Sequence, residues 1–532
     1  MAIVLPKKKL GLQTVHQRGG ESVDFEQPNP GDVFMLMAFG WASICFLMVT
    51  FGKQLAVRAA KLSASQNIRE LLLSEQTAIA GLMLVGIVGL AAAFWVFHRY
   101  KNISIAMFIA AITCANASWP PVHDVAFAIK YLTLLYLGSY GAVFFLKNGW
   151  RLVGTKFYRI YVFYVGWIAL VSLLTKARIG DLWYTATEFT LMIGFGVAWM
   201  MHLDNRSALL KFNRIVCFTA IPITFLHMLS PLLVDEFMAG GRFVSMFIRA
   251  TGFSTIYSIF VISLFWLSMY EKKPNLRQIY TILALIGFGM ILLSGTRNAT
   301  VATLAGLGAL WWVFRSKIFI YIVFVGIVGL LIQTIIGGVE NLEMLTERLQ
   351  STENSRLAAW EMYIRLLMES PIIGYGFEGL VSAVWGETMT NMNAIYSSRR
   401  LIVPGVHNNY LGFGVRWGLV GLGLQLTIYT LAFRQAWKVI FSARVAMEDK
   451  RIYILPVTWL MLVALEALFE DTMSSTGRGT LHGVIYAVSP IILYVYGARL
   501  LDTADEEYEA NADQPASSSR SSINRPVAEK GA

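Results

Sequence analysis

Long apolar runs separated by short polar connections dominate this chain. The runs are about 18 to 25 residues long, enough for an α-helix to cross a hydrocarbon layer about 30 Å thick. They lack the alternation typical of a β-barrel, and helices satisfy their own backbone polar groups in lipid. The pattern therefore predicts an all-α polytopic integral membrane protein with about 12–14 transmembrane helices. The predicted spans are 33–51, 78–97, 103–118, 126–146, 157–174, 184–201, 214–233, 253–270, 277–294, 300–314, 318–337, 408–433, 452–470 and 480–499, of which 103–118 and 300–314 are short.

One long polar interruption, and a polar tail at each end, divide this apolar chain. We expect disordered cytoplasmic tails at both ends, because neither shows a helical or strand period. Between the tails, the large polar loop separates two groups of helices. The expected parts are the tail 1–32, transmembrane helices 1–11 in 33–337, the large periplasmic loop 338–407, transmembrane helices 12–14 in 408–500, and the tail 501–532.

Basic residues give the chain an orientation. Only 14% of residues are charged, 56% are hydrophobic, and the net charge of +11 is dispersed over short connections. Lys and Arg favour cytoplasmic loops, so the connections after even-numbered spans, and both tails, are predicted to be cytoplasmic. The connection 52–77 is the exception, because it is basic yet falls outside in this scheme. It could lie on the membrane as an amphipathic segment. Dispersed charge argues against a nucleic-acid partner.

The connections predicted to lie outside carry arginines that translocated loops usually avoid. A guanidinium is permanently charged and binds phosphate through two parallel hydrogen bonds. Arg249 and Arg297 precede or follow spans, and Arg356 lies in the large loop. Such arginines, converging on one outer cavity, would suit a diphosphate headgroup. Arg242 is the substitute if Arg249 faces elsewhere. The three cysteines, Cys45, Cys114 and Cys217, lie within predicted spans and are interpreted as structural thiols.

The large loop is predicted to contain an amphipathic helix on the outer membrane surface. Helical spacing runs from Asn354 or Ser355, a candidate N-cap, to Met368, and Pro371 and the glycines after it end the helix. The loop closes on His407, at the mouth of the next span. A histidine beside an asparagine at such a position is often only part of a helix cap, so catalysis there depends on the context.

The order and spacing of these pieces resemble the O-antigen ligase and Wzy-type polysaccharide polymerase superfamily. The resemblance covers about residues 214–433. Upstream, the motif beginning at Arg249 lacks the Asn-Pro-Asn that often follows it in the family. The motifs that carry the resemblance are Arg249-x-x-Gly252-Phe253, Ser294-Gly-Thr-Arg297, Arg356-x-x-x-Trp360, Ser370-Pro371-x-x-Gly374-x-Gly376 and His407-Asn408-x-Tyr410.

The resemblance implies an enzyme of the bacterial inner membrane with its active site on the periplasmic face. It would transfer a glycan from an undecaprenyl-diphosphate-linked oligosaccharide to an acceptor hydroxyl, without metal or another cofactor, and would invert the anomeric centre. His407 would be the general base, because imidazole can be neutral near pH 7. Arg297, Arg356 and Arg249 would bind the diphosphate. Trp360, Asn408 and Tyr410 would support the site.

Three alternatives stay open at this point. The acceptor could be another lipid-linked repeat unit, as in an exopolysaccharide or O-antigen polymerase, or a lipid A core, as in an O-antigen ligase. The tail lengths favour the polymerase slightly. A lipid-linked glycan flippase is the alternative from another class, although no internal repeat typical of transporters is present. A non-catalytic member of an assembly complex would not need His407. Membrane lipids, a chain-length regulator and a flippase are candidate partners.

The orientation predicts which cysteines an impermeant thiol reagent will reach. Ser382→Cys, in the large loop, should be labelled in intact cells from the periplasm. Ser442→Cys, in a predicted cytoplasmic connection, should be labelled only after permeabilisation. Both are compared with the chain that carries only its native cysteines. Labelling of Ser382→Cys only in permeabilised cells would overturn the orientation.

Overall fold

The computed structural model describes the greater part of the helical chain. The described residues are 13–16, 22–25, 29–41, 88–115, 117, 120–154, 156–175, 186, 189–190, 206–233, 237–239, 242–245, 250–316, 324, 359–376, 379–380, 383, 406–470 and 481–512.

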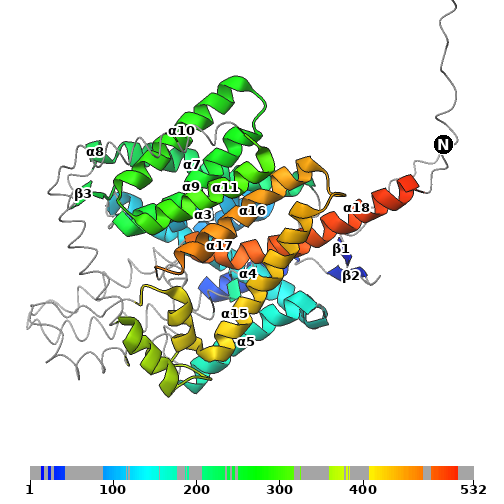
Figure 1. The fold of residues 1–532 in the computed structure, drawn as a ribbon. Helices are drawn as coiled ribbons and strands as arrows, with labels where there is room; N and C mark the ends of the chain where they lie inside the picture. Colours follow the sequence, from blue (N-terminus) through cyan, green and yellow to red (C-terminus); the bar gives the residue numbers. More distant parts are fainter. Residues whose placement is uncertain are drawn as a thin grey trace, which may run out of the picture.

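Helices make up almost all of this part (Figure 1). Two short antiparallel pairs of strands are also present. The helices are α3 (Lys101–Cys114), α4 (Pro120–Gly154), α5 (Lys156–Leu174), α7 (Arg206–Met228), α8 (Ser230–Leu233), α9 (Ala250–Tyr270), α10 (Pro274–Leu293), α11 (Arg297–Phe314), α15 (Asn409–Phe441), α16 (Met447–Glu466), α17 (Leu481–Ile491), a π-helical turn (Ile492–Tyr496) and α18 (Gly497–Ala512). The strands are β1 (Gln13–His16), β2 (Ser22–Phe25), β3 (Met238–Ala239) and β4 (Arg242–Phe243).

Seven helices in the described part are long and apolar enough to cross a membrane. The prediction of an all-α polytopic membrane protein is therefore confirmed. Two of the shorter predicted spans are also helical, as α3 and α11, and the span 452–470 corresponds to α16. The predicted spans 33–51, 78–97, 184–201 and 318–337 lie wholly or partly outside the described residues. The seven helices are Val122–Arg151, Lys156–Leu174, Leu209–Met228, Gly252–Tyr270, Pro274–Leu293, Asn409–Phe441 and Gly483–Glu506.

Helix α9 forms the centre of the bundle. It packs against α7, α10, α11 and α16 (Figure 1). It is the most deeply buried of the seven spanning helices of the described part. Its polar side chains bond across to neighbouring helices, because lipid offers them no water. The Tyr257 hydroxyl donates to Thr224 Oγ1 of α7 at 2.8 Å, and the Trp459 indole of α16 donates to Ser263 Oγ at 3.0 Å.

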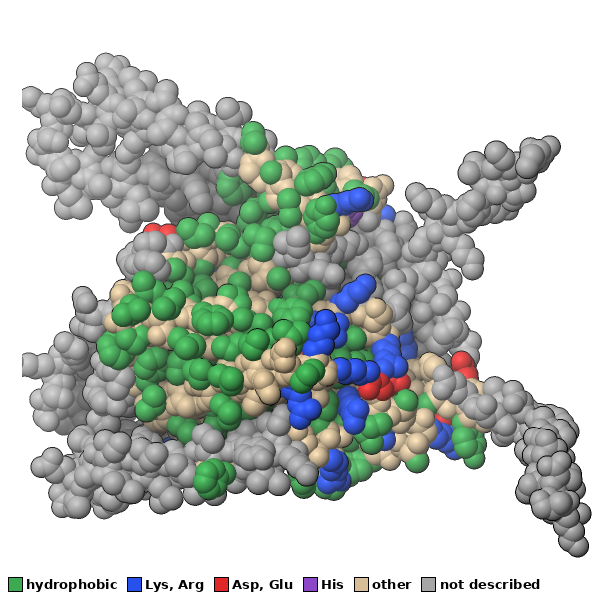
Figure 2. Space-filling model, turned by 90° about the horizontal axis from the view of Figure 1, so that it is seen from above, with side chains coloured by type: hydrophobic (Ala, Val, Ile, Leu, Met, Phe, Trp, Pro, Cys, Tyr) green, Lys and Arg blue, Asp and Glu red, His purple; other side chains and the backbone are tan. Residues whose placement is uncertain are grey.

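The outer surface of the bundle is apolar, as expected of helices that face lipid. Large exposed side chains such as Leu146, Phe163 and Ile282 come from different spanning helices. Figure 2 shows a broad hydrophobic surface with Lys and Arg side chains gathered toward one end of it. That distribution has the form expected of a polytopic membrane protein under the positive-inside rule.

The ends of the chain differ in part from the sequence expectation. Within the N-terminal segment expected to be disordered, β1 pairs with β2, with Val15 opposite Val23. At the other end, α18 continues to Ala512, twelve residues into the segment expected to be the C-terminal tail, and leaves the bundle in Figure 1. Asp505 there forms an ion pair with Arg444, which follows α15, at 2.6 Å. This ion pair stabilises the helical conformation of a polar segment.

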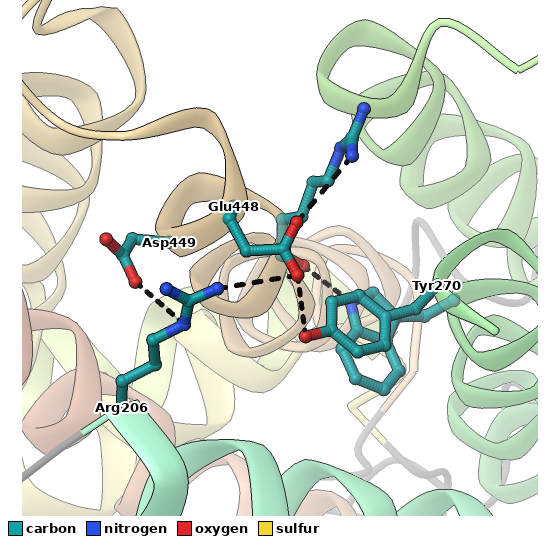
Figure 3. Close-up of polar contacts among 6 residues, drawn as sticks. Arg206, Tyr270, Glu448 and Asp449 are labelled. Carbon is teal, nitrogen blue, oxygen red and sulfur yellow. Dashed lines mark hydrogen bonds and ion pairs between the residues drawn. The ribbon is translucent and has the colours of Figure 1, made fainter. Parts of the chain in front are cut away.

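A polar cluster ties α7, α9 and α16 together at the end predicted to be cytoplasmic (Figure 3). The Glu448 carboxylate lies 3.4 Å from Arg206 and 3.7 Å from Arg451, and accepts a 3.0 Å hydrogen bond from the Tyr270 hydroxyl. Arg206 also pairs with Asp449 at 3.3 Å. One carboxylate therefore joins three separate elements.

Replacement of Glu448 should weaken this end of the bundle in a salt-dependent way. We expect Glu448→Gln to lower the stability of the detergent-solubilised protein by about 1 kcal/mol, the scale of a partly exposed ion-pair network. Thermal unfolding at low and high salt measures the effect, which should shrink at about 1 M salt. Glu506→Gln, which removes an exposed carboxylate of α18, is the matched control. Equal shifts for both variants would contradict a specific role for the cluster.

Candidate functional site

His407 lies directly before α15 in an uncommon backbone conformation. Its φ of +45° is in the left-handed region, which few residues other than glycine adopt, although histidine and asparagine adopt it more often than most. The side chain is 44% exposed, and Nδ1 lies 3.5 Å from Oε2 of Glu470, whose side chain is only 13% exposed. The structure therefore presents one edge of the imidazole to the outside and the other to a carboxylate.

The helix cap beside it is made by Asn408 rather than by His407. Asn408 has an extended backbone, and its Oδ1 accepts a 3.0 Å hydrogen bond from the backbone N–H of Leu411. This satisfies one of the N–H groups that a helix start leaves free. Capping is thus the role of the asparagine, which leaves the histidine ring available for chemistry.

The beginning of α15 is fastened to the end of α16. The backbone N–H of Asn409 donates to the carbonyl of Ala467 at 2.8 Å, and the hydroxyl of Tyr410 donates to the carbonyl of Ala464 at 3.1 Å. Tyr410, predicted to support the site, therefore fixes one helix against the other. Glu470 lies in the turn that follows the same carbonyls.

Trp360 is hydrogen-bonded to the residue that precedes His407. The helical residues 359–369 confirm the C-terminal part of the predicted loop helix, and the Trp360 indole donates to the carbonyl of Val406 at 2.8 Å. From the same helix, Met362, Tyr363 and Leu366 form a small apolar cluster with Val406 and Val415. The loop helix thus packs on the residues around the start of α15.

The segment after this helix docks into a break in α15. Gly418, with φ +69° and ψ 178°, interrupts the helix, which would leave nearby carbonyls without partners. The N–H groups of Tyr375 and Gly376 donate to the carbonyls of Val415 and Arg416 at 3.0 and 2.8 Å. The Leu419 N–H, just beyond the break, donates to the carbonyl of Pro371 at 2.7 Å.

A tryptophan from α5 completes the break. The Trp167 indole donates to the carbonyl of Trp417 at 2.8 Å. A Cβ at Gly418 would overlap the carbonyl of Ile372, and one at Gly374, where φ is +76°, would overlap the carbonyl of Arg416. The Ser370-Pro371-x-x-Gly374-x-Gly376 motif therefore acts through its backbone, as the partner of a broken helix.

Of the arginines predicted to bind the diphosphate, Arg297 is the one that lies within the described residues. Arg297 is the first residue of α11, exposed, after a turn in which Gly295 has φ +64°. No hydrogen bond or ion pair joins Arg297 to His407 among the described residues. Arg249 and Arg356 lie outside the described residues, and only the backbone of Arg242, in β4, is described.

Three residues of this region were not predicted as site residues. Arg416 is only 9% exposed although it is charged. It lies in the first part of α15, between His407 and the break at Gly418. Charge within an apolar span is the signal that could have selected it. In the sequence, Gly418 is one of several glycines in a predicted span, a pattern typical of helix packing. Glu470 is one of several ionisable residues near the ends of predicted spans, and its distance to His407 is what distinguishes it.

Part of this chain, including the region around His407, is similar to known proteins. Residues 282–426 match the family model Wzy_C, described as O-antigen ligase. The O-antigen ligase of Pseudomonas aeruginosa PAO1 is 28% identical over 235 residues, which are 42% of this chain and 51% of that protein. The chain thus spans about half the length of that curated relative. The segment matched by the family model includes Arg297, Trp360 and His407 but ends before Glu470, and the resemblance seen in the motifs is confirmed.

The break in α15 predicts a sharp contrast between two glycines of that helix. Gly418→Ala should lower folded yield and melting temperature severely, because the new Cβ meets a backbone carbonyl and the left-handed conformation disfavours alanine. Gly423→Ala is the matched control, because nothing lies within 4 Å of its added Cβ. For each variant, gel filtration measures the folded yield, and thermal unfolding in detergent measures the melting temperature. Similar behaviour of the two variants would show that the docked segment does not need Gly418.

Proposed function

We propose that this multi-pass membrane protein is a glycosyltransferase, because residues 282–426 match the O-antigen ligase family model and an O-antigen ligase is among its relatives. The donor is a glycan linked to undecaprenyl diphosphate, and the acceptor is a hydroxyl of a second saccharide. The reaction takes place at the periplasmic face of the bacterial inner membrane. The observation that carries this proposal is the half-exposed His407, held at the start of α15 with a carboxylate behind it.

The arrangement supplies a general base at the end of a membrane helix. His407 removes the proton of the acceptor hydroxyl, and the resulting oxygen nucleophile attacks the anomeric carbon of the donor. The bond between that carbon and the diphosphate oxygen breaks, and its electron pair leaves on the lipid diphosphate. A single displacement of this kind inverts the anomeric centre.

Charge on the departing diphosphate needs stabilisation. Arg297, exposed at the start of α11, is the described candidate, with Arg356 and Arg249 as further cations. Their guanidinium groups would bind the phosphates through paired hydrogen bonds, a role that Mg²⁺ has in other transferases. The Arg416 side chain is a buried cation of the same helix that His407 precedes.

The acceptor separates two versions of this function. The family model and the P. aeruginosa relative are both described as O-antigen ligases, which favours a ligase, whose acceptor is a lipid A core. The motif resemblance supports equally a polymerase, whose acceptor is another lipid-linked repeat unit of an O-antigen or exopolysaccharide. Both versions use the same donor and the same base.

Transfer by the purified protein tests this proposal. The wild type is given a defined lipid-linked repeat unit, either alone or with lipid A core. A ladder of chain lengths identifies a polymerase, and products formed only on lipid A core identify a ligase. We expect His407→Ala to lower kcat by about 10²- to 10⁴-fold, the usual contribution of a general base.

His123→Ala is the matched control, because it removes a histidine at the beginning of α4, and it should keep wild-type kcat. Unchanged turnover in His407→Ala would refute the assignment of the base. Movement of the glycan across proteoliposomes without covalent transfer would favour a flippase instead.

A further inference from the structure

The end of α16 and the turn after it contact the residues around His407 from one side. Ala464, Ala467 and Glu470 are three residues apart, and residues three and four apart lie on the same side of a helix. Their partners are Tyr410, Asn409 and His407 in turn, at 3.1, 2.8 and 3.5 Å. The contact between Glu470 and the imidazole is therefore the last of three in one register.

We propose that Glu470 is the positioning residue of the general base, which turns the His407 ring so that Nε2 faces the acceptor hydroxyl. This inference rests on the proposed function. It concerns a residue beyond the segment that matches the family model, which ends at residue 426. Glu470 acts through His407 and does not itself touch the substrate.

The tautomer follows from the geometry. A neutral imidazole carries one proton, and a hydrogen-bond partner at one nitrogen decides which nitrogen keeps it. Nδ1 is the nitrogen that faces the Glu470 carboxylate, which accepts hydrogen bonds only, so Nδ1 carries the proton. The lone pair is then on Nε2. The distance of 3.5 Å exceeds a normal hydrogen bond, as catalytic contacts often do before substrate binds.

The surroundings of Glu470 suit such a role. Its backbone N–H donates to the carbonyl of Glu466 at 3.0 Å, so the turn that carries it continues from α16. The neighbouring carboxylate, Glu466, is fully buried and accepts a 3.0 Å hydrogen bond from Ser258 of α9. Glu466 is thus committed to packing between helices, whereas the carboxylate of Glu470 reaches the imidazole.

The carboxylate also has a part in the proton transfer. When Nε2 takes the proton of the acceptor hydroxyl, the ring becomes an imidazolium with both nitrogens protonated. A negative charge beside Nδ1 stabilises that cation in a site only 13% exposed on the carboxylate side. The proton and the charge are therefore both accounted for without a further reactant.

A double-mutant cycle separates positioning from a structural role. We expect Glu470→Ala to lower kcat about 10- to 100-fold with the KM for the lipid-linked donor within about twofold of wild type. Glu470→Gln should keep more activity, because its amide oxygen can accept a hydrogen bond from Nδ1–H. In the His407→Ala background, Glu470→Ala should lower the residual rate no further, since its partner is gone. Glu361→Gln, an exposed carboxylate of the loop helix, should match wild type.

Each outcome decides the inference. An equal fold-loss from Glu470→Ala in both backgrounds, together with a lower melting temperature, would show a structural role and overturn it. Unchanged kcat in Glu470→Ala, while His407→Ala still shows its large loss of kcat, would overturn it and leave the proposed function standing. Unchanged kcat in His407→Ala would instead refute the proposed function itself.

Discussion

The constraint on which this structure depends is that backbone polar groups within an apolar bundle must find partners. The break in α15 at Gly418 exposes carbonyls and an N–H, and segment 371–376 together with Trp167 supplies their partners. That docking holds the loop helix against α15. The loop helix in turn places Trp360 on the carbonyl of Val406, beside His407. One interrupted helix therefore organises both sides of the candidate site.

The site divides its tasks among neighbouring residues. Asn408 caps α15 through its side chain, Tyr410 bonds α15 to α16, and His407 keeps a half-exposed ring. Because the cap and the anchoring contacts are made by other residues, the left-handed backbone of His407 is held from both sides. The strain is local and lies at the residue that the chemistry needs, which is where such conformations are commonly found.

Much of this could be predicted from patterns along the chain. Apolar runs predicted the all-α class and the spanning helices of the described part of the chain. The spacing around Trp360 predicted the loop helix, because both predictions depend on local periodicity. The partners of these elements could not be predicted in the same way. The sequence around Gly418 does not show that segment 371–376 packs against the break in α15. Glu470 is separated from His407 along the chain by two helices, α15 and α16. Contacts of that kind depend on how helices cross, and hydropathy does not record that.

By itself, the sequence determined that this chain is an all-α polytopic membrane protein, and that His407 follows a long polar stretch and precedes an apolar span. These properties follow from the transfer of side chains and peptide groups into lipid, which each segment carries independently. Only the tertiary structure decided that His407 has Glu470 behind one nitrogen, and that a glycine-rich motif serves as the partner of a broken helix. Those facts come from hydrogen bonds and packing between distant segments, whose energies exist only when the segments meet.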